Sequence, residues 1–169
     1  MLKTSIIRCL ILCCMISNTV YAEPFVTMTD EILNRINQYR SQHGRSTLHL
    51  NSTMSGEAQR HSQDMAMHIA TVGHTGFEQR MKHIRTKISG TTSGAENVAY
   101  RYNTAKIVVE GWIHSPGHRR NILGNYTLTG IGIARDRAGD YYYTQLFANK
   151  NTGAHTLMQK RTRRLHIFS

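Results

Sequence analysis

The sequence predicts an α+β fold in which helices cover an antiparallel sheet. Apolar residues recur at helical spacing through the first half of the chain, and a second helical stretch is broken at Ser115-Pro116. Two strand-like runs, residues 128–134 and 141–147, then follow each other closely. Helices that precede a terminal hairpin, in a chain of 169 residues, indicate a single layered domain.

Two helices are expected first. Thr29 and Asp30 can cap a helix that ends near Gly44, with apolar residues three and four positions apart. A short extended link then leads to Asn51 and a second helix. The expected core stripe of this helix consists of Met54, Ala58, Met65 and Ile69. His61 and His68 lie on one face of it, and without a third ligand nearby they are interpreted as solvated or hydrogen-bonded side chains.

The middle of the chain is less regular. Residues 73–77 predict a turn, and residues 78–84 a short helix after it. Residues 88–94 are rich in Ser, Thr and Gly, so a loop is expected there, before a short strand over residues 95–100.

A helix, a corner and a second helix are expected over residues 108–124. Ser115 is a good N-cap, Pro116 suits the first helical position, and Gly124 can form a left-handed cap at the end. The corner carries His118, and Glu110 lies on the helix before it. His114 is four residues from His118, but the break between them excludes a helical metal pair.

The last two strands are expected to pair as an antiparallel hairpin. Gly130 and Gly132 are two residues apart and share one strand face, so another element can pack closely there. Trp112 is expected to be a core residue, and Asn97 and Asn121 are expected to hydrogen-bond nearby backbone.

Residues 1–22 have the pattern of a cleaved signal peptide, with Lys3 before an apolar run too short to span a bilayer. This predicts a secreted or periplasmic protein with a domain over residues 23–150, a basic tail over residues 151–169 and no transmembrane anchor after cleavage. All three cysteines lie in the leader, which excludes thiol catalysis and cysteine-ligated zinc in the mature chain.

The chain is strongly basic, with a net charge of +11. Without Lys3 and Arg8, 19 basic residues against 10 acidic residues still leave +9. Anionic surfaces are therefore expected partners. No nucleic-acid-binding module is recognisable, so no specific nucleic acid is expected.

Five ordered blocks between Asp30 and Phe147 resemble the CAP superfamily of cysteine-rich secretory, antigen 5 and pathogenesis-related 1 proteins, in particular its compact bacterial SCP-domain members. The blocks are Asp64-Met65-Ala66, Gly73-His74-Thr75-Gly76, Ala95-Glu96-Asn97-Val98-Ala99, the run from Glu110 to Leu123, and Tyr143-Thr144-Gln145-Leu146-Phe147. The resemblance implies a three-layer α-β-α sandwich.

The resemblance also implies a cleft with a tetrad of His74, Glu96, Glu110 and His118. The two histidines are the expected ligands of a divalent metal, with zinc favoured, and the two glutamates are the candidate catalytic carboxylates. From the residues alone, two separated histidines match no compact zinc motif. Either glutamate could equally serve in a structural salt bridge.

The function expected from this combination is a secreted binding module. Its ligands would be a divalent metal and a small apolar molecule of sterol or fatty-acyl type, or an extracellular protein or glycan. A metal-assisted hydrolase that uses the same tetrad is one alternative, although the sequence has no Gly-x-Ser-x-Gly or His-Glu-x-x-His motif. A structural or interaction role in the cell envelope is another.

Overall fold

The computed structural model describes residues 24–151, so the expected leader and, apart from Asn151, the expected basic tail lie outside the described residues. Its elements are α1 (Pro24–Gln42), β1 (His49–Leu50), α2 (Ser52–Ala66), α3 (Phe77–Lys87), β2 (Thr91–Tyr100), α4 (Ala105–His114), α5 (Pro116–Ile122), β3 (Leu128–Arg135) and β4 (Tyr141–Lys150). Within this part of the chain, none of the helices combines the length and the apolar character needed to cross a membrane.

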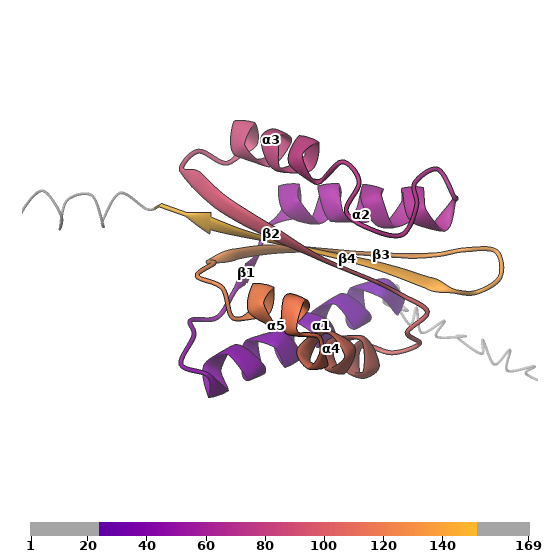
Figure 1. Cartoon of the computed structure of the whole chain (residues 1–169), viewed down its shortest axis with the longest axis horizontal. Coiled ribbons are helices and arrows are strands. Elements are labelled where there is room, and N and C mark those ends of the chain that lie inside the picture. The colour runs from indigo at the N-terminus through magenta and orange to yellow at the C-terminus, as the bar shows by residue number, and fades with distance from the viewer. Residues whose placement is uncertain (1–23, 152–169) are drawn as a thin grey trace, which may run out of the picture.

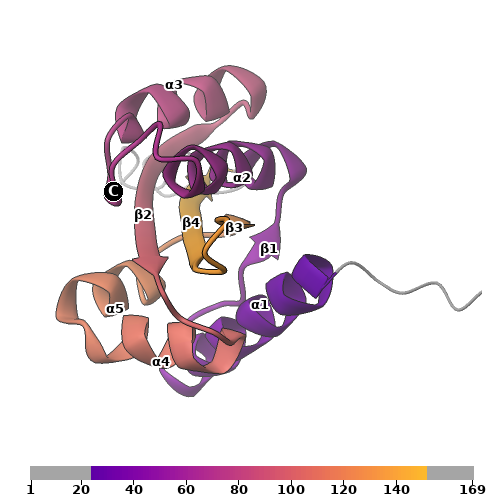
Figure 2. The same cartoon turned by 90° about the vertical axis from the view of Figure 1, so that its right-hand side faces the viewer.

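The fold is a three-layer sandwich, as expected. A four-stranded sheet lies between α2 and α3 on one side and α1, α4 and α5 on the other (Figure 1). The strand order is β1-β3-β4-β2, which places the long strand β2 at one edge. Viewed from the end of the molecule, this edge runs between α3 and α5 (Figure 2). Segments from both helical layers therefore reach the same edge of the sheet.

The sheet is mixed, which corrects the expectation of a purely antiparallel one. The pairs β3–β4 and β4–β2 are antiparallel, but β1 pairs with β3 in parallel through His49 and Leu50. Two residues provide no readable alternation of polar and apolar side chains, so this strand gave no pattern in the sequence.

The strand β2 begins at Thr91, inside the segment expected to be a loop. Thr91 and Ser93 pair with Lys150 and Asn149 of β4, with an irregular register between them. The partner strand supplies the backbone hydrogen bonds here, and this pairing overrides the weak strand propensity of a Ser, Thr and Gly-rich segment.

The apolar core fills both sides of the sheet. One cluster joins α1 and α4 to the sheet around Ile36, Trp112 and Phe147. Two others lie beneath α2 and α3. The expected core stripe of α2 is confirmed for Met54, Ala58 and Met65. The prediction that Ile69 belongs to this stripe is wrong, because α2 ends at Ala66 and Ile69 is 71% exposed.

Gly130 and Gly132 allow α2 to lie directly on β3, as their spacing indicated. A Cβ atom at Gly130 would overlap the backbone of Met54, and one at Gly132 would overlap the backbone of Ala58. Gly124 does not form the expected left-handed cap. The helix α5 ends earlier, at Ile122, and its C-cap residue is Leu123 with φ −90°.

The buried Arg40 connects α1 to the end of α5. Its guanidinium donates to the carbonyls of Ile122, Gly124 and Tyr126, and its Nε donates to the carbonyl of Ser46. Burial lowers the pKa of this side chain. The carbonyls of Ile122, Gly124 and Tyr126 lie at or beyond the end of α5, where no further helical turn can bond to them, so Arg40 satisfies these carbonyls and positions α5.

Candidate functional site

The edge of β2 brings together three of the four residues expected in the tetrad. His74 comes from the loop between α2 and α3, Glu96 from β2, and His118 from the first turn of α5. Nδ1 of His74 lies 2.9 Å from Oε1 of Glu96. His118 is close enough for the charge of His74 to lower its pKa, in addition to the larger effect of burial.

Glu96 is a buried carboxylate, with 2% of its side chain exposed. Two guanidinium nitrogens of Arg80, on α3, hydrogen-bond to this carboxylate. Nε donates to Oε2 at 2.9 Å, and Nη2 donates to Oε2 at 2.7 Å and to Oε1 at 2.9 Å. A buried carboxylate needs such a partner, because an unpaired charge in this environment is very costly.

The hydrogen bond to Glu96 defines which nitrogen of His74 is available. When Nδ1 donates to the carboxylate, Nε2 is left as the acceptor of the neutral ring. The side chain of His74 is 56% exposed, so this nitrogen lies where a ligand can reach the ring.

Two asparagine side chains connect β2 and α5 at this site. Nδ2 of Asn97 donates to the carbonyl of His118, and Nδ2 of Asn121 donates to the carbonyl of Glu96 and to Oδ1 of Asn97. Contacts to backbone were expected for both residues, and both are confirmed. They attach α5 to the edge of β2 and set the position of His118 relative to Glu96.

The structure does not bring Glu110 to this group. Its side chain is 52% exposed, its nearest ionic partner is Lys106 with Nζ–Oε1 at 4.0 Å, and it borders a groove between α4 and α1. The neighbouring Val109 and Trp112 occupy the buried face of α4, which directs Glu110 outward. Of the two candidate catalytic carboxylates, only Glu96 therefore lies at the edge of β2.

His114 is also apart from the group, as expected. Its Nδ1 bonds to the carbonyl of Glu110, one turn earlier in α4. Trp112 is a core residue, as expected, with its Nε1 directed at the carbonyl of Val98 on the edge strand.

Sequence reasoning missed Arg80. The residue lies on the side of α3 that faces the sheet, next to the buried Met81 and one turn before Ile84. A cation beside an apolar stripe is the pattern that could have indicated it, because a cation in that position requires a carboxylate within the fold. Gly76, with φ 79°, starts α3 in a left-handed conformation and leaves space for the guanidinium, which also donates to the carbonyl of Thr75.

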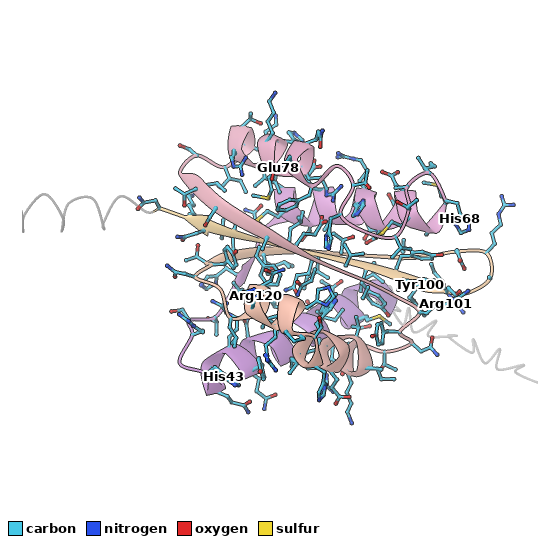
Figure 3. All side chains as sticks on the ribbon, viewed as in Figure 1. His43, His68, Glu78, Tyr100, Arg101 and Arg120 are labelled. Atoms are coloured by element: carbon cyan, nitrogen blue, oxygen red, sulfur yellow. The ribbon has the colours of Figure 1, made fainter. Side chains whose placement is uncertain are left out.

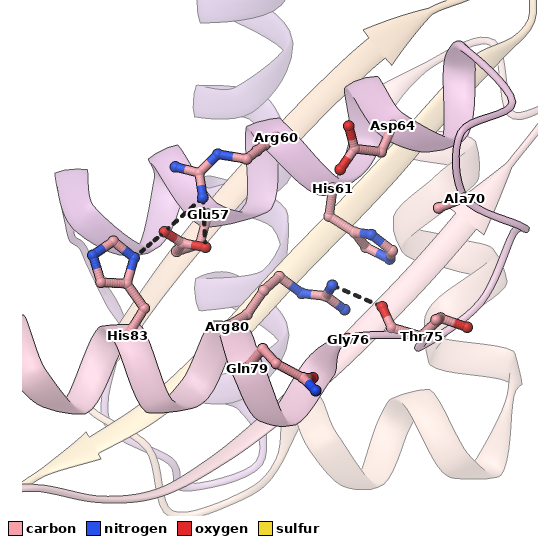
Figure 4. A pocket seen from close by; sticks show the side chains of 10 residues that line it. All are labelled: Glu57, Arg60, His61, Asp64, Ala70, Thr75, Gly76, Gln79, Arg80 and His83. Atoms are coloured by element: carbon pink, nitrogen blue, oxygen red, sulfur yellow. Dashed lines mark hydrogen bonds and ion pairs between the residues drawn. The ribbon is translucent and has the colours of Figure 1, made fainter.

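A cavity of about 350 Å³ adjoins Arg80 between α2 and α3 (Figure 4). At one end Glu57, which is buried, accepts hydrogen bonds from Arg60 and pairs with His83. His61 lies farther along α2 and bonds to the carbonyl of Gly73, so it is a satisfied histidine, as expected. Burial is the main cause of the lowered pKa of His61. Charged side chains at one end of this cavity, Glu57, Arg60 and His83, are thus engaged with one another.

At the edge of β2, Glu96 serves as a hydrogen-bond acceptor that orients His74. Both oxygens of Glu96 already accept hydrogen bonds, so neither is free to take a proton from water. Among residues 24–151, no three His, Cys, Asp or Glu side chains are grouped closely enough to hold a metal ion. The two imidazoles are the available nitrogen ligands of the site.

The fold and this cluster define an α-β-α sandwich domain with a His/Glu group at the edge of its sheet. The family model described as CAP, the cysteine-rich secretory protein family, matches residues 33–147. The chain belongs to this family.

Two proteins of Bacillus subtilis (strain 168) are similar in sequence. The uncharacterized membrane protein YlbC is 31% identical over 132 residues, covering 73% of this chain and 35% of the relative. The uncharacterized protein YkwD is 33% identical over 141 residues, covering 79% of this chain and 52% of the relative. The chain therefore spans between about a third and a half of the length of these relatives.

Solved structures agree on the fold. An outer surface protein of Borrelia burgdorferi has a TM-score of 0.68 at 16% identity, covering 78% of this chain and 98% of its own. An extracellular protein from Bacillus anthracis with an SCP domain has a TM-score of 0.60 at 26% identity, covering 77% of this chain and 45% of its own.

Proposed function

We propose that this chain is an extracellular binding domain whose recognition site is the pair of imidazoles at the edge of β2. The observation that carries the proposal is the contact between His74 and the buried Glu96, itself held by Arg80. This contact presents Nε2 of His74 on the same edge as His118. Burial favours the neutral form of His118, the form in which an imidazole nitrogen binds a metal or accepts a hydrogen bond.

The two histidines are a partial fit for a divalent metal, with zinc favoured. They provide two nitrogen ligands, whereas structural zinc sites use four protein ligands and catalytic sites use three. We therefore expect weaker binding than in a closed site. A bound metal would offer its open coordination positions to a donor atom of a ligand or partner.

A calorimetric titration with zinc chloride tests this site. We expect the double variant His74→Ala/His118→Ala to bind zinc at least tenfold more weakly than the original chain, because both proposed nitrogen ligands are removed. His43→Ala is the matched control, since His43 is exposed at the end of α1. Equal zinc uptake by the original chain and the double variant would contradict the proposal.

The groove between α1 and α4 is the proposed site for a small apolar ligand. It has a volume of about 210 Å³, and Tyr39, Val109 and Ile113 line it together with polar side chains that include Glu110. This is below the roughly 300 Å³ at which drug-sized pockets begin, so a single acyl chain suits the groove better than a sterol ring system.

Displacement of a fluorescent fatty acid checks the groove. We expect Ile113→Asp to weaken fatty-acid binding at least fivefold and to leave zinc binding unchanged, because the groove and the β2 edge use different residues. Ile107→Asp is the control, since Ile107 is on the same helix but outside the groove. Retention of fatty-acid binding in Ile113→Asp would rule out this groove as the ligand site.

An extracellular location is part of the proposal. It is supported by the signal-peptide pattern of residues 1–22 and by the descriptions of two structural relatives, one as an extracellular protein and one as an outer surface protein.

A further inference from the structure

The loop after α2 exposes a cluster of large apolar side chains. Met67, Ile69 and Val72 are 59%, 71% and 48% exposed. In the described part of the chain, the other exposed large apolar residues, Leu50 and Ile107, each stand alone on another element. We call residues 67–72 the apolar loop. A concentration of apolar side chains on a surface marks an interaction site more often than single exposed residues do.

The backbone of the apolar loop is held in place. The amides of Ile69 and Ala70 both donate to the carbonyl of Asp64, at 2.8 and 3.1 Å. His68 adopts φ 57°, and His61 bonds to the carbonyl of Gly73 just beyond the loop. The fold therefore keeps these apolar side chains exposed through specific backbone bonds instead of burying them.

Basic side chains lie next to the apolar loop. A hollow of about 650 Å³ separates Met67 and His68 from the turn between β3 and β4, which we call the hairpin tip, residues 135–140. Arg135 and Arg137 of the hairpin tip are exposed. Arg135 packs over the ring of Tyr141 and donates to the carbonyl of Gly139.

The acidic residues of the hairpin tip are already engaged. Asp136 accepts hydrogen bonds from the hydroxyl of Tyr142 and from the amide of Asp140, and Asp140 pairs with Arg101. Both carboxylates are thus engaged within the hairpin tip or with that arginine, and the exposed charged side chains that remain on the hairpin tip are Arg135 and Arg137.

A tyrosine, Tyr100, lies at the same end of the molecule as the apolar loop. The ring of Tyr100 lies beneath the guanidinium of Arg101 and 5.3 Å from the ring of Tyr142. Figure 3 places Tyr100 and Arg101 at the same end as His68, whereas His43 and Arg120 lie elsewhere. Tyrosine is enriched where proteins meet the interface between a membrane and water.

Size and charge favour a lipid surface over a protein partner. Six loop residues and a six-residue hairpin tip fall short of the roughly 20–30 residues that each side contributes to a stable protein interface. A second copy of this chain would also bring a net charge of +11 to a basic surface. A bilayer with anionic headgroups needs only a few inserted apolar side chains and nearby cations.

We propose that the apolar loop and the hairpin tip dock this domain on an anionic membrane surface, with Met67, Ile69 and Val72 entering the interface and Arg135 and Arg137 facing lipid phosphates. None of these residues belongs to the β2-edge site. The two proposals therefore stand or fall separately.

Cosedimentation of residues 23–169, the chain without the predicted signal peptide, with vesicles tests this docking. The vesicles are equal mixtures of phosphatidylglycerol and phosphatidylcholine, or phosphatidylcholine alone. We expect at least tenfold stronger partitioning to the anionic vesicles, and at least tenfold weaker partitioning there for Met67→Ser/Ile69→Ser/Val72→Ser. Arg137→Gln should reduce it about threefold and remove part of its salt dependence.

The matched control variants substitute exposed residues of the same types at other positions on the surface. Leu50→Ser/Ile107→Ser and Arg120→Gln should partition within twofold of the original chain. Docking by the apolar loop is overturned if the triple serine variant binds as well as the original chain, or if the control variants lose binding equally. It is also overturned if light scattering shows a dimer that the triple variant abolishes while vesicle binding is unchanged.

A direct probe is the variant Ile69→Trp. Its fluorescence should shift to the blue and be quenched by brominated lipids when anionic vesicles are added, because the side chain enters the interface. The native Trp112 is buried and provides a constant background. An emission spectrum that does not change on vesicle addition would contradict insertion of this loop.

Discussion

Arg80 shows how a single residue determines the geometry of the β2 edge. Its guanidinium bonds to both oxygens of Glu96, and Glu96 in turn bonds to His74. Arg80 thus acts on His74 through another side chain. The orientation of the imidazole depends on an ion pair with only 10% and 2% of its side chains exposed.

We expect Arg80→Gln to lower the free energy of unfolding by about 3–5 kcal/mol, because it leaves a buried carboxylate without its cation. Urea unfolding measures this loss. Arg35→Gln is the control, since Arg35 and its partner Glu31 are 39% and 48% exposed and their ion pair contributes about 1 kcal/mol or less. Equal losses for the two variants would show that the Arg80–Glu96 pair contributes no more to the free energy of unfolding than an exposed ion pair does.

At the scale of elements, the packing of α2 on β3 sets the position of the upper layer. Gly130 and Gly132 present bare backbone to α2, so the helix and strand approach more closely than side chains would permit. The loop that carries His74 leaves the end of this helix, and the packing of α2 thereby influences where His74 reaches the sheet edge.

The variant Gly132→Ala should destabilise the fold by about 3 kcal/mol, because the new methyl group would overlap the backbone of Ala58. Thermal unfolding checks the effect. Gly56→Ala, in the middle of α2 with open space around it, should instead stabilise the protein by about 0.5–1 kcal/mol. If Gly132→Ala were neutral, the close approach of α2 and β3 would not be needed for stability.

At the scale of the whole molecule, two histidines link stability to pH. The pKa of His61 and that of His118 are both lowered from 6.5, mainly by burial. The unfolded chain therefore binds protons near pH 6.5 that the folded chain resists. Folding stability contributed by the neutral rings is present above about pH 6.5 and is lost as the pH falls through the lowered pKa of each group.

Urea unfolding at pH 7.5 and pH 5.0 should accordingly give a lower free energy of unfolding at the acidic pH. His118→Gln should reduce this difference, because one of the two groups no longer titrates, and the exposed His43→Gln should leave it unchanged. A pH dependence identical in the original chain and in His118→Gln would exclude His118 as a contributor.

The sequence by itself determined the layers and most of the elements. Apolar residues at helical spacing predicted α1 and α2, Ser115-Pro116 predicted the break between α4 and α5, and alternating runs predicted β3 and β4. The ordered blocks around His74, Glu96 and His118 indicated the family that the match over residues 33–147 shows. Local spacing carries this information because each pattern depends on neighbours within a few residues.

Only the tertiary structure decided which residues meet at the sheet edge. Arg80 reaches Glu96 because α3 and β2 pack together, and Glu110 faces α1 because the buried side of α4 is taken by its neighbours. The parallel pairing of β1 and the early start of β2 likewise depend on partner strands. Such contacts join residues far apart in the chain, and no pattern of local spacing can contain them.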